Sequence, residues 1–154
     1  RVYTKTCTFF DFLNTCKNQY HTNSSLHVNW SDGYMDSPIW NYYVSNDLIC
    51  KNADGSYVST WYDSVNKRQA YAMNLKKLWD VGRLQQQIDS IVKQFPQLVD
   101  GALLIDANVY YASAYHGITA NDQKVAFAKA IQYAHQKYGL DLHAEYGADS
   151  QSNM

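Results

Sequence analysis

Apolar residues follow helical spacing in three parts of the chain. Between Thr8 and Tyr20 they recur at gaps of three and four residues, which places them on one face of a short amphipathic helix. The same spacing runs from Leu84 to Leu98, where Pro96 and Gly101 mark the end of the helix. A third stripe, over residues 125–135, predicts another helix.

The third helix carries signals for both of its ends. Thr119 is a suitable N-cap, and Asp122 stands at the third helical position, as in a capping box. Lys137 and Gly139 are typical of a helix carboxyl end. The pattern therefore predicts a helix between Thr119 and Gly139.

Three short segments have the composition of strands. Residues 25–30 alternate apolar and polar side chains and precede a Ser-Asp-Gly turn, so we expect this strand to end near Asp32. Ala102–Asp106 is a continuous apolar run closed by an acid, which is typical of a fully buried parallel strand. Leu140–Gly147 is also short and has an acid, Glu145, near its carboxyl end.

The stretch over residues 34–79 is the least regular part of the sequence. A Ser-Pro pair fits the start of a helix near Ile39. Residues 48–61 predict a hairpin, because the turn residues at 52–55 separate two short runs of strand formers. Long excursions of this kind inside a compact domain usually form functional rims.

The alternation of helices and strands predicts an α/β fold, in which helices cover a parallel sheet. No glycine-rich phosphate loop follows any strand, which argues against the nucleotide-binding doubly wound folds. A (β/α)8 TIM barrel fits better, but it needs about 250 residues. We therefore expect residues 1–154 to be part of one barrel, about three βα units, with a long decorated loop that contains a small hairpin and with no second domain. Both chain ends suggest an excerpt of a longer sequence.

Composition excludes several classes of protein. The 13 basic and 14 acidic side chains nearly balance, with no basic stripe for a nucleic acid. Apolar residues make up 46% and charged residues 18%, as in a globular domain, and no apolar run reaches the length of a membrane helix. Oligomeric state is left open. The three cysteines, Cys7, Cys16 and Cys50, have neither the spacing of a disulfide scaffold nor that of zinc ligands. We expect no metal and no cofactor.

Asp106 and Glu145 end two successive predicted strands that one crossover helix separates. Neighbouring parallel strands lie ~4.8 Å apart, and catalytic groups of barrels gather at their carboxyl ends. Glycosidic cleavage uses two carboxyl groups, and a gap of ~5 to 5.5 Å fits retention of configuration. The spacing also fits acids that cap helices or form ion pairs. For Asp106 this alternative is weaker, because four apolar residues precede it and a partly desolvated carboxylate without a function costs free energy.

Further polar and aromatic residues lie near these acids. Aromatic residues make up 15% of the chain, and 14 of them are tyrosines. Such rings can stack on sugars, or they can simply cover a partly solvated surface. Histidines and an amide close to the acids suit hydrogen bonds to sugar hydroxyls: Asn108, His116 and His143. For His143, a core position is the alternative that its place within a strand favours. The loop after Asp106 contains Tyr110, Tyr111 and Tyr115. Their rings either form a platform for a sugar or pack against one another.

Four segments, in order and at similar distances, resemble the catalytic barrel of bacterial endo-α-N-acetylgalactosaminidases and the related α-N-acetylgalactosaminidases. They are His27–Pro38, Leu78–Gly82, Ile105–Asn108 and Ala144–Gly147. The resemblance covers most of the chain and only the middle of such a barrel. It implies a retaining glycoside hydrolase that cleaves α-linked N-acetylgalactosamine of mucin-type O-glycans, so the partner is a carbohydrate on an O-glycan or glycoprotein.

The resemblance also implies site residues. The nucleophile falls on Asp106 and the acid/base on Glu145, and a sugar contact falls on Asp32, with Asp36 as the alternative. Further substrate contacts are expected beside them: Asn108, His116 and Tyr146. Such enzymes are often exported, which favours an extracellular or cell-surface location in a bacterium, with the cytoplasm as the alternative.

Two other functions share these features. One is another barrel α-glycosidase, for instance on α-galactosides, which would use the same pair of carboxyl groups. The other is a carbohydrate-binding barrel fragment without turnover. A metal-dependent hydrolase is less well supported, because no pair of histidines has ligand spacing near a carboxylate.

Overall fold

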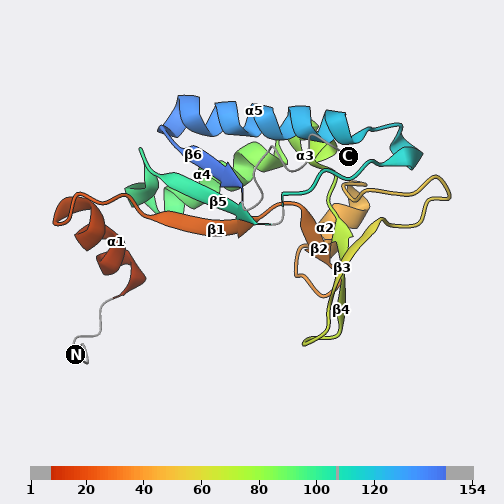
Figure 1. Cartoon of the computed structure of the whole chain (residues 1–154), viewed down its shortest axis with the longest axis horizontal. Helices are drawn as coiled ribbons and strands as arrows, with labels where there is room; N and C mark the ends of the chain where they lie inside the picture. Colours follow the sequence, from red (N-terminus) through yellow and green to blue (C-terminus); the bar gives the residue numbers. More distant parts are fainter. Residues whose placement is uncertain (1–7, 107, 145–154) are drawn as a thin grey trace.

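The computed structural model describes residues 8–106 and 108–144 of the chain (Figure 1). In order, it forms α1 (Phe9–Asn18), β1 (Ser25–Asn29), β2 (Asp32–Tyr34), α2 (Trp40–Ser45), β3 (Ser59–Asp63), β4 (Arg68–Ala72), α3 (Leu75–Asp80), α4 (Arg83–Gln94), η1 (Pro96–Leu98), β5 (Ala102–Asp106), η2 (Ala114–His116), α5 (Ala120–Tyr138) and β6 (Asp141–Ala144). No helix within these two ranges combines the length and the apolar character that a membrane span requires.

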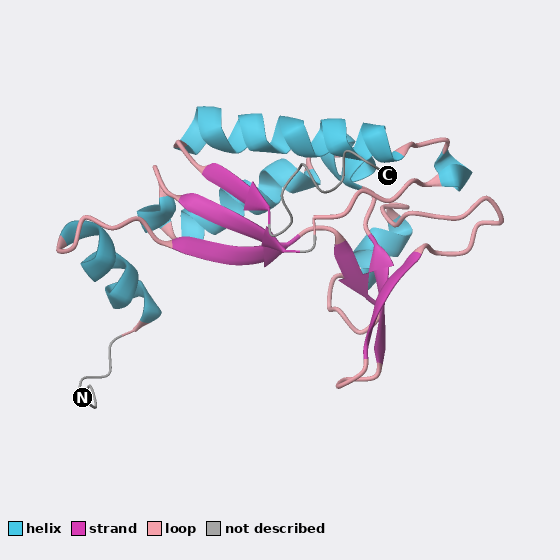
Figure 2. Ribbon diagram, viewed as in Figure 1, coloured by secondary structure: helices cyan, strands magenta, loops and turns pink. Residues whose placement is uncertain are grey.

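The strands form two sheets (Figure 2). One is parallel with the order β1-β5-β6, and its register pairs Val28 with Ile105 and Ile105 with Ala144. The other is antiparallel with the order β2-β4-β3. The predicted α/β class and the parallel arrangement of its three strands are therefore confirmed. The parallel register also brings the carboxyl ends of β1, β5 and β6 to one edge of the sheet.

The core lies between the parallel sheet and the helices α3, α4 and α5, which Figure 1 shows on the same side of it. Leu103 and Ile105 of β5 are fully buried against this layer, together with Ile88 of α4 and Ala130 of α5. Removing a Leu or Ile side chain from water contributes roughly 1.5–3 kcal/mol. Burial of these apolar stripes is what holds the helices against the sheet.

The other face of the parallel sheet is more open than the sequence predicts. Leu104 of β5 is only half-buried, and its two register partners, His27 of β1 and His143 of β6, are exposed. The expectation of a fully buried β5 is thus wrong for alternate residues. The core position favoured for His143 is wrong as well, because the alternation of β6 directs His143 away from the helices.

The ends of α5 follow the predicted signals. The Thr119 side chain accepts a hydrogen bond from the Asp122 backbone N–H, and the Asp122 carboxylate accepts one from Thr119 N, so the capping box is complete. Gly139 ends the helix with φ +63°, a left-handed conformation that glycine adopts without strain. The predicted helix between these two residues is confirmed.

The irregular middle segment contains more structure than the sequence predicts. The predicted hairpin turn exists, since Lys51 and Tyr57 form an antiparallel bridge around residues 52–55. The main hairpin is the unpredicted pair β3 and β4, whose turn lies at residues 64–67. Asp32 is not a turn residue but the first residue of β2, where it pairs with Ala72 of β4.

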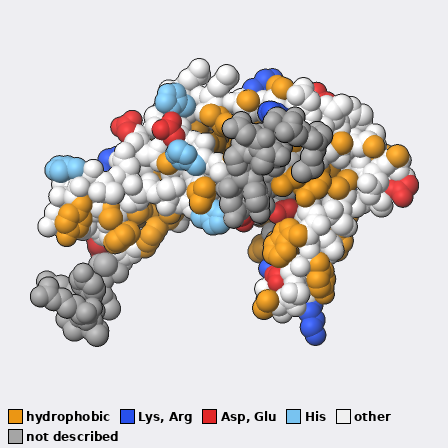
Figure 3. All heavy atoms as spheres, in the orientation of Figure 1, with side chains coloured by type: hydrophobic (Ala, Val, Ile, Leu, Met, Phe, Trp, Pro, Cys, Tyr) orange, Lys and Arg blue, Asp and Glu red, His pale blue; other side chains and the backbone are white. Residues whose placement is uncertain are grey.

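The predicted first helix forms as α1, but its apolar face is largely exposed. Leu13 is buried, whereas Phe9, Phe10 and Phe12 are each exposed by 42% or more. The rings of Phe9 and Phe10 contact Phe95, which follows α4. Figure 3 shows hydrophobic side chains at the surface in this region and over the β3–β4 hairpin.

Candidate active site

Asn29 is the centre of the polar cluster at the carboxyl edge of the parallel sheet. Its side-chain Oδ1 accepts hydrogen bonds from the backbone N–H groups of Ser31 (2.9 Å) and Asp32 (3.0 Å). Because the oxygen is engaged by two donors, the Nδ2 group must point the other way. It lies 3.4 Å from Oδ2 of Asp32 and 3.4 Å from Oδ2 of Asp106. One amide therefore bridges the two carboxylates.

Asp106 ends β5 directly opposite Asn29, its register partner on β1. Its Oδ1 lies 3.6 Å from Nε2 of His27, which is two residues earlier on the same face of β1. The Asp106 side chain is 35% exposed. Both oxygens have a nitrogen nearby, yet these contacts are long enough to leave acceptor capacity for a further group.

Asp32 is held more tightly than Asp106. Thr60 donates its hydroxyl to Oδ1 at 2.8 Å, and the Trp61 indole N–H donates to Oδ2 at 3.2 Å. Both donors come from β3, so the antiparallel sheet fixes a carboxylate next to the end of the parallel one. This junction of the two sheets places Asp32 and Asp106 beside the same amide.

The negative charge of this cluster affects the pKa values of two tyrosines. Burial raises the pKa of Tyr34, and the negative charge of Asp32 raises it further, against the opposing effect of Arg68. Burial and then Asp32 also raise the pKa of Tyr111. Tyr34 meets Trp61 edge to face, with ring centroids 6.1 Å apart. The carboxylates thus have aromatic neighbours from the antiparallel sheet and from the loop after β5.

The structure brings together Asp106 and Asp32 of the predicted site residues. Glu145 and Tyr146 lie outside the described residues. Asp36, the alternative to Asp32, forms an ion pair with Arg68 instead. Asn108 is buried and donates to the Tyr110 hydroxyl at 2.8 Å, and the Tyr110 ring packs against Phe127. For Tyr110, the contacts favour packing over a sugar platform.

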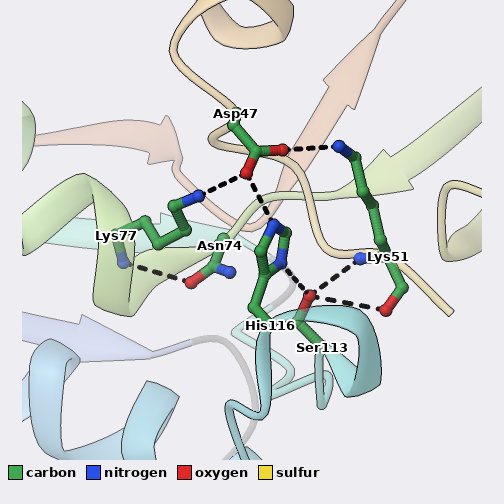
Figure 4. A network of polar contacts seen from close by, with 6 residues as sticks. All are labelled: Asp47, Lys51, Asn74, Lys77, Ser113 and His116. Carbon is green, nitrogen blue, oxygen red and sulfur yellow. Dashed lines mark hydrogen bonds and ion pairs between the residues drawn. The ribbon is translucent and has the colours of Figure 1, made fainter. Parts of the chain in front are cut away.

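His116 belongs to a different cluster, which Figure 4 shows from close by. Its Nε2 lies 2.8 Å from Asp47 Oδ2, and its Nδ1 lies 2.7 Å from Ser113 Oγ. Asp47 also accepts hydrogen bonds from Lys51 and Lys77. Since both ring nitrogens bind protein groups, these contacts give no support to the predicted sugar contact for His116.

The order Asp47, His116, Ser113 has the connectivity of a hydrolase triad, but the environment does not suit one. Ser113 is fully buried, and its hydroxyl oxygen accepts the Lys51 backbone N–H at 2.8 Å. A nucleophilic serine must reach a substrate carbonyl, and this one is enclosed. The cluster instead ties the loop before α5 to the loop after α2.

This cluster gives a pH-dependent contribution to stability. Burial alone would raise the pKa of Asp47, but hydrogen bonds from Lys51, Lys77 and His116 outweigh it and hold the pKa well below the ordinary value. A lowered folded-state pKa stabilises the protein above the unfolded pKa of about 3.9, and this contribution is lost as the pH falls through the folded value.

We expect Asp47→Asn to lower stability at pH 7 by about 1 kcal/mol, allowing for solvent screening of a side chain that is 38% exposed. The difference from the wild type should shrink as the pH falls below about 4. Thermal unfolding followed by circular dichroism at pH 7 and pH 3 measures both. Asp80→Asn, which breaks only the exposed pair with Lys76, is the control and should change little. An equal loss at both pH values would contradict this account.

Other reactive groups of the described residues are not part of the site. Cys50 is buried, and burial raises the pKa of its thiol to about 12, so it is a poor nucleophile at neutral pH. Over residues 8–106 and 108–144, no three His, Cys, Asp or Glu side chains gather as they would around a metal ion.

Sequence reasoning missed three residues of this site: Asn29, Thr60 and Trp61. Asn29 ends the observed strand β1 as Asp106 ends β5, and strand ends collect functional groups, but the predicted strand continued past Asn29 to about Asp32. Thr60 and Trp61 lie in the segment read as irregular. Nothing local in the sequence indicates that they reach Asp32.

Comparison with known proteins supports the fold. No protein-family model and no curated protein matches the sequence. Among solved structures, the α-N-acetylgalactosaminidase of Bifidobacterium bifidum, in its complex with N-acetylgalactosamine, aligns with a TM-score of 0.67 and 14% identity over 88% of this chain and 21% of its own. Its ligand-free form aligns with the same TM-score and 13% identity.

A second glycosidase aligns over nearly the same part of the chain. It is the α-galactosidase of Thermus thermophilus, in complex with p-nitrophenyl α-D-galactopyranoside, with a TM-score of 0.57 and 17% identity over 87% of this chain and 26% of its own. The chain thus spans 21–26% of the length of these structures. At such identities the likeness establishes a shared α/β fold with portions of glycoside hydrolases.

Proposed function

We propose that this chain is the part of a (β/α)8 barrel that carries the catalytic carboxylates of a retaining glycoside hydrolase acting on α-linked N-acetylgalactosamine. The observation that carries the proposal is the convergence of Asp32 and Asp106 on the Asn29 amide, at the carboxyl edge of a parallel sheet. This is the edge where barrel enzymes assemble their sites. The alignment with two glycosidases that act on α-configured sugars supports the same reading.

The open face of the parallel sheet supports the barrel. Parallel sheets normally have both faces covered, and in a closed barrel the face away from the helices is the packed interior. Here that face presents His27, Leu104 and His143, of which the two histidines are exposed. Further βα units would cover it and would complete the pocket around Asp106.

In the proposed reaction, an Asp106 oxygen attacks the anomeric carbon while Glu145 donates a proton to the departing glycosidic oxygen. The glycosyl–Asp106 ester is then hydrolysed by a water molecule that Glu145 deprotonates. Glu145 follows Ala144 in sequence just as Asp106 follows Ile105, and Ala144 and Ile105 are register partners. Asp32 would accept a hydroxyl of the bound sugar.

An α-galactoside is the second candidate substrate. The α-galactosidase alignment favours it, and the same carboxylates would serve, because the two sugars differ only at the group on C2. Mucin-type O-glycans as the natural source, and export from a bacterial cell, remain part of the proposal that rests on the sequence resemblance.

The test is an assay of the full-length protein that carries this chain. We expect it to hydrolyse p-nitrophenyl α-N-acetylgalactosaminide faster than the matching α-galactoside, with the α-anomer as first product by proton NMR. Residues 1–154 alone should be inactive and prone to aggregate, because sheet edges and the open face would lack their cover. A soluble, cooperatively folded and active 154-residue protein would overturn the barrel, and a first product of β-configuration would overturn the retaining mechanism.

A further inference from the structure

Asn29 is an exposed asparagine whose amide nevertheless has one fixed orientation. Its Oδ1 accepts the backbone N–H groups of Ser31 and Asp32, at 2.9 Å and 3.0 Å. An amide nitrogen cannot accept either of these hydrogen bonds, so the opposite rotation of the amide is excluded. Backbone register adds a second restraint, because Asn29 of β1 lies beside Asp106 of β5. The Nδ2 group is therefore held toward the two carboxylates by the backbone itself.

The two carboxylates that share this amide depend on it to different degrees. Asp32 has two other donors, both from β3, at 2.8 Å and 3.2 Å. In the part of the chain that the structure describes, Asn29 is the only side chain that donates a hydrogen bond to Asp106. The other oxygen of Asp106, Oδ1, faces His27 Nε2 at 3.6 Å, which is beyond hydrogen-bond distance. Loss of the Nδ2 donor should therefore affect Asp106 far more than Asp32.

The place of Nδ2 between two acids also bears on their charge. Neighbouring carboxylates disfavour each other's ionised form, and a hydrogen bond to the ionised form opposes that effect. The amide has two N–H groups, enough to serve both acids at once, and its nitrogen lies 3.4 Å from Oδ2 of Asp32 and of Asp106. Because a carboxyl nucleophile must be ionised to attack, a donor at this position favours the reactive form of Asp106.

Resting on the function proposed above, we infer that Asn29 is a positioning residue for the nucleophile Asp106. Its amide holds Oδ2, so Oδ1 is the oxygen that forms the bond to the anomeric carbon, while the glycosidic oxygen leaves with the proton of Glu145. In the glycosyl ester, Oδ2 becomes the carbonyl oxygen and still accepts from Asn29. Asn29 thus acts on the reaction through Asp106.

Two substitutions of Asn29 in the full-length protein separate this role from support of the chain turn. Asn29→Asp keeps an oxygen that can accept the backbone N–H groups of Ser31 and Asp32, but it replaces the donor by a negative charge. Asn29→Ala loses both functions. Asn23→Asp is the matched control, because Asn23 is also exposed and precedes the other end of β1, where its side chain donates to the Asp100 carbonyl oxygen at 2.7 Å.

At pH 7, Asn29→Asp should lower kcat for an activated α-N-acetylgalactosaminide about 100-fold or more, and Asn29→Ala about 10-fold. KM should change less than about 3-fold in both variants, because Asp32 keeps its donors from β3. Asn23→Asp should keep both constants. If Asn29 merely supports the turn, the order reverses, since Ala loses the turn contacts that Asp retains. That reversed order, or a loss confined to KM, would overturn the inference.

A carboxyl-carbon NMR titration of aspartate-labelled protein gives a readout that needs no catalysis. The Asp106 signal, identified by its loss in Asp106→Asn, should titrate about one pH unit or more higher in Asn29→Asp than in the wild type. Ionisable groups of the described chain also face Asp106 and are the same in both proteins: His27 of β1, and Asp32 and Tyr34 of β2. An unchanged midpoint would contradict the role of Asn29.

Circular-dichroism melts establish whether each variant folds. If Asn29→Asp does not fold, Asn29→Ser replaces it, because a hydroxyl can accept a backbone N–H at the turn but is too short to reach both carboxylates. Its kcat should fall about 10-fold with KM unchanged, and a wild-type kcat would refute the inference. The two proposals fail separately: an inactive wild type removes the hydrolase function, whereas an active wild type whose Asp106 titrates alike in Asn29→Asp removes only the role of Asn29.

Discussion

Replacing Asp106 by Asn in the full-length protein should lower kcat for glycoside cleavage by at least about a thousand-fold and leave the fold intact. The amide has the same shape as the carboxylate but cannot attack the anomeric carbon, and removal of a covalent nucleophile has effects of this size or larger. Folding should persist because the Asp106 side chain is partly exposed and its contacts with His27 and Asn29 are long. Steady-state kinetics with an activated α-N-acetylgalactosaminide and a circular-dichroism melt measure the two effects.

Asp141→Asn is the matched control for this experiment. Asp141 is an aspartate of the same parallel sheet, at the amino end of β6, and its side chain is 67% exposed. Barrel enzymes place chemistry at the opposite edge, so this variant should keep its activity. Near wild-type turnover by Asp106→Asn would remove the nucleophile role from Asp106.

The parts of the fold that the sequence predicts are those with local signals. The helix α5 is confirmed at both ends because the capping box at Thr119 and the left-handed Gly139 act within one turn of the chain. The strand β5 is confirmed because four consecutive apolar residues before Asp106 suit a strand of a covered sheet. The antiparallel sheet is not predicted from the sequence, because β3 and β4 do not alternate apolar and polar residues and β2 is only three residues long.

Of the candidate site, the sequence predicts only the acidic residues that lie at strand ends. Asp32 and Asp106 were identified by position and resemblance, and the structure places both beside Asn29. The hydrogen bonds from Thr60 and Trp61 to Asp32 could not be predicted. The two donors lie 28 and 29 positions after Asp32 in the sequence, and the strand that carries them is irregular. The pairing of Asp106 with Glu145 stays a prediction.

The two sheets have different tasks in the proposed enzyme. The parallel sheet places Asp106 by backbone register, which depends on the buried Leu103 and Ile105 and is insensitive to surface change. The antiparallel sheet places Asp32 through side chains of an exposed hairpin, where substitutions are tolerated more easily. We therefore expect the hairpin to adjust substrate choice while the parallel sheet preserves the chemistry.

Replacing Glu145 by Ala should show its acid/base role through the leaving group. Without a proton donor, glycosides with poor leaving groups should lose about a hundred-fold to ten-thousand-fold in rate, whereas an aryl leaving group of low pKa needs little protonation and should lose far less in the first step. Azide, which needs no general base, should enter the vacated space and react with the glycosyl intermediate to give an α-glycosyl azide. Leaving-group series and product analysis by NMR measure both. A uniform loss across all leaving groups, with no azide product, would contradict the assignment, and an azide product of β-configuration would show that no intermediate on Asp106 had formed.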